Sequence, residues 1–147
     1  MIPTVEWKDG VVRLLDQSRL PGHTELLECK DVAAVASAIQ ELKVRGAPAI
    51  GVTAAMGVAL GAQSVSAADV STFERHVLGI CDQLAATRPT AVNLFWALTR
   101  MKVVVRENRA CTIAEIQSRL VQEALAIQQE DIAMCKAMGQ HGAGLIK

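Results

Sequence analysis

The sequence is poor in aromatic side chains and has no excess of either charge. Its 147 residues include two tryptophans, two phenylalanines and no tyrosine, and Lys+Arg and Asp+Glu both number 15. Zero net charge gives no general attraction to nucleic acid or to an anionic membrane. An aromatic content of 3% argues against a surface that stacks bases. We therefore expect no nucleic acid and no membrane among the partners.

Metal-binding and targeting motifs are also lacking. No two of the cysteines, which stand at positions 29, 81, 111 and 135, have the C-x-x-C spacing of a zinc or redox site. The N-terminus has no basic region followed by an apolar run, so it does not read as a signal peptide. We expect a cytoplasmic protein with reduced, mostly buried thiols, and we favour this over a disulfide. We expect no metal and no cofactor.

One segment, residues 46–68, carries no charged side chain and is long enough to span a bilayer. It consists mostly of small residues and has a proline at its start. Gly51, Gly57 and Gly61 would let a neighbouring backbone approach closely. We therefore expect a buried, closely packed helix here and not a transmembrane one.

The chain begins with strand patterns and continues with helical ones. Residues 4–8, 11–15 and 25–29 are predicted strands, and Asp9-Gly10 is a strong hairpin signal. Helices are predicted from Asp31 to about Gly46, over 48–61, over 71–86, from Pro89 onward, and from Thr112 until it weakens near Gly139. Capping-box patterns at 71–74 and 112–115 mark two of the starts. We expect Trp7 and Trp96 to anchor the core.

Strands followed by helices predict an α+β fold, a small antiparallel sheet against a helical bundle. Residues 1–30 form the sheet, and residues 31–140 form a bundle of about five helices in the same domain. Residues 141–147 are expected to begin a linker or strand into a further domain. The apolar pair Leu145-Ile146 would either dock onto the core or enter a following strand, and we favour the second.

The strongest candidate for chemistry is the junction between two predicted helices at residues 44–51. The first N–H groups of a helix have no intrahelical partner, and the helix dipole makes that end partly positive. Gly46 and Ala47 leave room for an anion, and Arg45 adds a bidentate donor. These features fit a phosphate cradle. A plain helix–helix turn with a solvated arginine fits the same residues.

A second junction repeats this arrangement. Arg88 precedes Pro89 at a predicted helix start, and Asn93 lies one turn further on, where its amide could bind a sugar hydroxyl or its own backbone. The two junctions could converge on one phosphate, although spacing alone does not require it. We interpret His23, His76 and His141 as structural or surface residues. Asp131 continues the apolar stripe of the last helix. It would either make a buried polar contact with a further region or reflect drift of the stripe, and we favour drift.

These strings resemble one family. LKVRGAPAIG at residues 42–51 and RPTAVNL at residues 88–94 look like signatures of methylthioribose-1-phosphate isomerases. Val5-Glu6-Trp7 and, in the last helix, Glu130-Asp131 with Cys135 are also similar. The resemblance runs along essentially the whole chain. Related groups carry variants of the first string. They are the ribose-1,5-bisphosphate isomerases and the regulatory subunits of the translation initiation exchange factor.

The resemblance implies an enzyme of methionine salvage that converts 5-methylthioribose 1-phosphate to 5-methylthioribulose 1-phosphate. It implies that Arg45, Gly46, Ala47 and Arg88 bind the substrate phosphate and that the full-length protein is a homodimer. It also implies that the catalytic Cys and Asp belong to a C-terminal Rossmann-like domain, whose motif does not occur here. We therefore assign no catalytic residue to this chain and expect it to be inactive alone. The alternatives are a ribose-1,5-bisphosphate isomerase, a non-catalytic regulatory subunit and an independent helical interaction domain.

Overall fold

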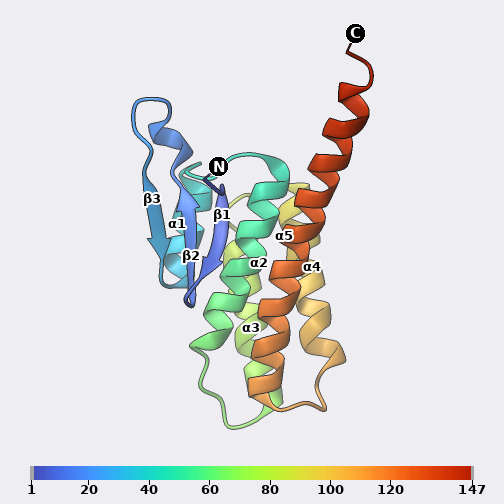
Figure 1. Cartoon of the computed structure of the whole chain (residues 1–147). Helices are drawn as coiled ribbons and strands as arrows, with labels where there is room; N and C mark the ends of the chain where they lie inside the picture. The colour runs from blue at the N-terminus through green and yellow to red at the C-terminus, as the bar shows by residue number, and fades with distance from the viewer. Residues whose placement is uncertain (1, 147) are drawn as a thin grey trace.

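The computed structural model describes residues 2–146 and has an α+β fold, as predicted. A three-stranded antiparallel sheet lies against one side of a bundle of five helices (Figure 1). The elements are β1 (Val5–Lys8), β2 (Val11–Leu15), β3 (Leu26–Cys29), α1 (Val32–Gln40), α2 (Ala47–Gln63), α3 (Val70–Ala85), α4 (Val92–Glu107) and α5 (Ile113–Ala143).

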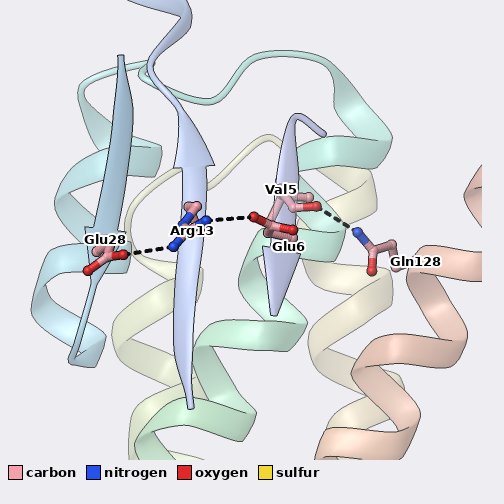
Figure 2. A network of polar contacts seen from close by, with 5 residues as sticks. All are labelled: Val5, Glu6, Arg13, Glu28 and Gln128. Atoms are coloured by element: carbon pink, nitrogen blue, oxygen red, sulfur yellow. Dashed lines mark hydrogen bonds and ion pairs between the residues drawn. The ribbon is translucent and has the colours of Figure 1, made fainter. Parts of the chain in front are cut away.

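The sheet follows the predicted hairpin pattern. Asp9 and Gly10 have φ of 51° and 76°, the left-handed pair that joins β1 to β2 in a two-residue turn. Alternate residues of the strands face the core, and those buried are Val5, Val12, Leu14 and Cys29. On the opposite face, Arg13 sits between Glu6 and Glu28 in register and pairs with both, at 3.3 and 3.0 Å (Figure 2).

Helix α2 is the centre of the molecule. It contacts the other four helices as well as β1 and β2, and every residue from Ile50 to Ala62 is buried. Small side chains make this possible, because α1 lies directly over Gly57 and Gly61. A β-carbon at these positions would approach Val35 and Val32 to 2.9 and 2.4 Å. The predicted buried, closely packed helix is confirmed. No helix within residues 2–146 is long and apolar enough to cross a bilayer.

Helix α1 ends six residues before the predicted stop at Gly46. Its last turn closes with Leu42 in the left-handed conformation, at φ 59°. The Leu42 N–H donates to Ile39 O and the Lys43 N–H donates to Ala38 O, at 3.2 and 2.9 Å. This is a Schellman motif with leucine where glycine is usual. The usual glycine signal is missing from the true end, so the sequence pattern placed the stop too late.

One predicted capping box and one predicted helix start are wrong, and the other capping box is confirmed. The carboxylate of Asp69, and not the predicted box at Ser71, caps α3 by accepting from Thr72 N–H. Pro89 lies in the turn before α4 and not in its first helical turn, since α4 begins at Val92. The capping box of Thr112 and Glu115 at the start of α5 is present as predicted.

Helix α5 is longer than predicted and ties the bundle to the sheet. It runs through Gly139 and Gly142 to Ala143, so residues 141–143 are helical. Near its middle, Gln128 Nε2 donates to the carbonyl oxygen of Val5 at 2.6 Å, at the outer side of β1 (Figure 2). The division into units remains a prediction, and Met1 and Lys147 lie outside the described residues.

Candidate functional site

The two predicted junctions become the starts of α2 and α4, which lie side by side. Both helices begin at the same end of the bundle, the upper end in Figure 1. They touch where a β-carbon on Gly51 would lie 2.8 Å from the carbonyl oxygen of Asn93. Gly51 belongs to the first string and Asn93 to the second. The fold therefore brings the two motifs, 42 residues apart in sequence, into direct contact.

These two helix starts differ from the others in how they are capped. Side chains of Asp31, Asp69 and Thr112 accept hydrogen bonds from the first turns of α1, α3 and α5. In the part of the chain that the structure describes, α2 and α4 begin at Gly46 and Ala91 with no side-chain cap. Their first N–H groups and their positive dipole ends thus point out of the same end of the bundle, an arrangement that favours an anion.

A pocket of about 330 Å³ opens between these helix starts and α5. It is lined by Pro48, Gly51 and Val52 of α2, by Val92, Asn93 and Trp96 of α4, and by Ile127, Glu130, Asp131 and Met134 of α5. One end therefore carries helix N-termini and an amide, and most of the wall is apolar. Such a site suits a small ligand with a polar and an apolar end.

The predicted binding residues are placed as follows. Asn93 lines the pocket. Arg45, Gly46 and Ala47 are exposed and immediately precede the lining residue Pro48. Gly46 has φ 96° and ψ 130°, a backbone conformation that side-chain-bearing residues rarely adopt. Arg45 Nε donates to the carbonyl oxygen of Leu42 at 3.1 Å, which holds the guanidinium over the turn.

Arg88 lies outside the lining set found among residues 2–146, as does Arg45. It is half-buried in the turn between α3 and α4, five residues before Asn93. The structure thus brings the helix starts together without placing either guanidinium in the pocket wall. The predicted roles of both arginines remain predictions.

Four wall residues were missed or misread from the sequence. Trp96, predicted to anchor the core, is 50% exposed and forms part of the wall, whereas Trp7 does pack against the core. Glu130 and Met134 were not candidates. Asp131 was attributed to drift of the apolar stripe but belongs to the wall. Its spacing of four from Ile127 was the available signal.

Charges in the α5 wall are partly compensated. Hydrogen bonds from Arg100 lower the pKa of Glu130 below its ordinary value. Asp131 is half-buried, and the Cys135 thiol lies 3.8 Å from its Oδ1. His23, His76 and His141 are exposed, as expected of surface residues. No group of three or more His, Cys, Asp or Glu side chains in the described range is placed to hold a metal ion.

Comparison with known proteins supports the family resemblance that the two sequence strings at the site indicate. Residues 43–147 match the model of the initiation factor 2 subunit family. The methylthioribose-1-phosphate isomerase of Geobacter metallireducens is 52% identical over 143 residues, which is 97% of this chain and 41% of that protein. That of Syntrophotalea carbinolica is 52% identical over 145 residues, or 99% of this chain and 42% of that protein.

Solved structures show the same likeness. The 5-methylthioribose 1-phosphate isomerase of Pyrococcus horikoshii superposes with a TM-score of 0.95 at 40% identity, over 99% of this chain and 41% of that one. The delta subunit of translation initiation factor eIF-2B from A. fulgidus superposes with a TM-score of 0.91 at 37% identity. The match covers 100% of this chain and 42% of that one. The chain spans about two-fifths of the length of these relatives. It is a member of the initiation factor 2 subunit family, and its resemblance to methylthioribose-1-phosphate isomerases is confirmed.

Proposed function

We propose that this chain is the phosphate-binding part of an aldose–ketose isomerase that converts 5-methylthioribose 1-phosphate to 5-methylthioribulose 1-phosphate. The observation that carries the proposal is the pair of uncapped helix N-termini, α2 and α4, held side by side by the contact of Gly51 with Asn93. A phosphate there would accept hydrogen bonds from N–H groups that no side chain occupies. The identity of the proposed substrate is taken from the relatives that are named methylthioribose-1-phosphate isomerases.

Each part of the site has a proposed task. Arg45 and Arg88 would close over the phosphate from the turns that precede the two helices, each offering a guanidinium fork. Asn93 would bind a hydroxyl of the sugar. The apolar wall that includes Trp96 and Met134 would take the methylthio end of the ligand, which carries no hydrogen-bonding group.

Turnover needs more than this pocket supplies. Moving a proton between C1 and C2 of a sugar phosphate requires an acid–base pair within hydrogen-bond reach of the substrate. Glu130 is held by Arg100 and is poorly suited to accept a proton. We therefore propose that residues 1–147 bind ligand weakly and do not turn it over. We also propose that a protein of the relatives' full length carries the activity and is a homodimer.

Binding is tested first with this chain by calorimetry, using 5-methylthioribose 1-phosphate and inorganic phosphate. Arg45→Met and Arg88→Met should each weaken binding about tenfold or more, since each removes a charge-assisted contact. Arg19→Met is the matched control, because Arg19 is an exposed arginine paired with Glu25 in the sheet region. Equal affinities for all four proteins would contradict the phosphate site.

Activity is tested by proton NMR, following formation of the ketose. No ketose should appear with this chain alone. Ketose should appear with a protein of the relatives' full length that includes this chain. Ketose from this chain alone would overturn the proposed inactivity and direct attention to Asp131. The likeness to the delta subunit of eIF-2B keeps a second candidate, a non-catalytic regulatory subunit. A full-length protein that binds the sugar phosphate without turnover would favour that candidate.

A further inference from the structure

Arg100 connects the two helices that form the outer walls of the pocket. It lies on α4, one turn after Trp96, and its side chain is about three-quarters buried, with 26% exposed. Its Nε donates to Glu123 Oε1 at 2.7 Å, and its two terminal nitrogens donate to the two oxygens of Glu130. Its guanidinium carbon also lies 5.1 Å from the centre of the Trp96 ring. One side chain therefore fixes a residue of α4 and two residues of α5.

Two of these three partners face the pocket. Trp96 and Glu130 line it, whereas Arg100 and Glu123 are not among the lining residues found within residues 2–146. Arginine suits this position because its planar fork can bind a carboxylate with two nitrogens while its face stacks on an aromatic ring. The distance of 5.1 Å is within the range of a cation–π contact, so the Arg100 cation helps to fix the ring of a residue that lines the pocket.

The charge of Arg100 matters to an anionic ligand. Glu123, Glu130 and Asp131 put three carboxylates on one stretch of α5, and Glu130 and Asp131 share the pocket with the helix starts. Arg100 is the cation that the structure records in contact with Glu123 and Glu130. Without it, Glu130 would join Asp131 as a second carboxylate of the pocket wall with no ion pair recorded among residues 2–146, and it would add to the repulsion of a phosphate held there.

We propose that Arg100 is a positioning residue that makes this pocket able to accept an anionic sugar phosphate. It does so by compensating the negative charge of the Glu130 carboxylate and by holding the Trp96 ring in place in the pocket wall. Arg100 itself does not touch the ligand. The inference rests on the function proposed above, from which it takes the negative charge of the ligand.

The charge effect is tested by calorimetry with 5-methylthioribose 1-phosphate on Arg100→Met. We expect binding about three- to tenfold weaker at low ionic strength, with a smaller difference at about 0.5 M salt, where charges are screened. The double variant Arg100→Met/Glu130→Gln should recover most of the affinity, because it also removes the unpaired carboxylate. Unchanged binding in Arg100→Met, or no recovery in the double variant, would overturn the charge role.

The matched control is Arg109→Met. Arg109 also makes a two-nitrogen pair with a glutamate, Glu74, but at the opposite end of α4. Its removal should lower stability and leave ligand affinity at the wild-type value. If Arg109→Met weakened binding as much as Arg100→Met, the effect would come from general loosening of the bundle, and the proposal would fail.

The positioning of Trp96 is tested without any ligand. In a Trp7→Phe background, Trp96 is the sole source of tryptophan fluorescence. Arg100→Met should increase acrylamide quenching and lower the anisotropy, whereas Arg100→Lys should restore affinity but not the ordered ring. Unchanged quenching and anisotropy would overturn the positioning role. If the wild type bound no sugar phosphate, the proposed function would fall, and this measurement would still decide whether Arg100 orders Trp96.

Discussion

Gly51 and Asn93 meet so closely that only a hydrogen atom fits between the α-carbon of one and the carbonyl group of the other. A β-carbon on Gly51 would lie 2.8 Å from the carbonyl oxygen of Asn93 and 3.3 Å from its carbonyl carbon. The obstacle is backbone, which cannot rotate away as a side chain can. The separation of α2 and α4 at the pocket therefore depends on the absence of a side chain at position 51.

Gly51→Ala is expected to destabilise the protein. The added methyl group must push α4 away, which costs about 1–3 kcal/mol for overpacking, and the better helix propensity of alanine returns about 1 kcal/mol. Urea unfolding followed by circular dichroism measures the difference. Gly79→Ala is the control, because Gly79 lies in α3 with open space around its α-carbon, and it should gain about 0.5–1 kcal/mol. A gain in both variants would contradict the close contact.

Leu42→Gly is expected to stabilise the end of α1. Leucine in the left-handed region costs about 1–2 kcal/mol, part of which glycine recovers because it has no β-carbon. We expect a gain of about 0.5–1 kcal/mol in thermal unfolding, after the larger entropy of glycine in the unfolded chain is subtracted. Leu26→Gly provides the comparison. Leu26 is similarly exposed, at 44% against 40%, but is extended in β3, so its replacement should destabilise.

The ion pair of Glu74 with Arg109 should make stability depend on pH in the acid range. Hydrogen bonds from Arg109 lower the pKa of the Glu74 carboxyl below its ordinary value of 4.5. A carboxyl whose folded-state pKa is lowered contributes stability above about pH 4.5, and this contribution is lost as pH falls through the folded-state pKa. Glu74→Gln should therefore be less stable than wild type by about 1–2 kcal/mol at pH 7, with the difference shrinking toward pH 3. A difference that is constant with pH would contradict this role.

Three of the four cysteines, Cys29, Cys81 and Cys135, should differ in reactivity. Burial raises the pKa of the Cys81 thiol to about 12, and burial also raises that of Cys29, whereas Cys135 is exposed on α5. Because the thiolate is the reactive form, a disulfide reagent at pH 8 should modify Cys135 rapidly and Cys29 and Cys81 only after denaturant is added. Cys135→Ser should remove the fast phase. Rapid modification of Cys81 in the folded protein would show that α3 opens readily.

Local signals in the sequence were read correctly where neighbouring residues decide the structure. The Asp9-Gly10 turn and the capping box at Thr112 depend on a few adjacent residues, and both are present. The box predicted at Ser71 failed because Asp69 supplies a competing cap two residues earlier. The glutamate of the predicted box, Glu74, instead accepts hydrogen bonds from Arg109, which is 35 residues distant in sequence. A local pattern contains no information about such a partner.

The pocket itself could be predicted only in part. The start of α2 at Gly46 follows from Pro48 and the string around it, and Asn93 is a predicted binding residue, whereas the start predicted from Pro89 lies before the true start of α4 at Val92. The α5 wall was missed because apolar spacing gives the direction of a stripe but not what faces it. Trp96 was misplaced for the same reason. The Trp96 ring is half-exposed and has the Arg100 guanidinium over it. The spacing of residues within α4 does not reveal this placement.

Because α2 is buried, a ligand at its first turn should affect amide hydrogen exchange far from the pocket. The candidate anion site lies at the first turn of this helix, while the rest of the helix forms the centre of the core. An element so placed should exchange its amide hydrogens only when the entire domain opens. A ligand held there would thus slow exchange at amides throughout the domain, in the sheet as well as in the bundle. Protection confined to the residues around the pocket would indicate that the end of α2 frays independently.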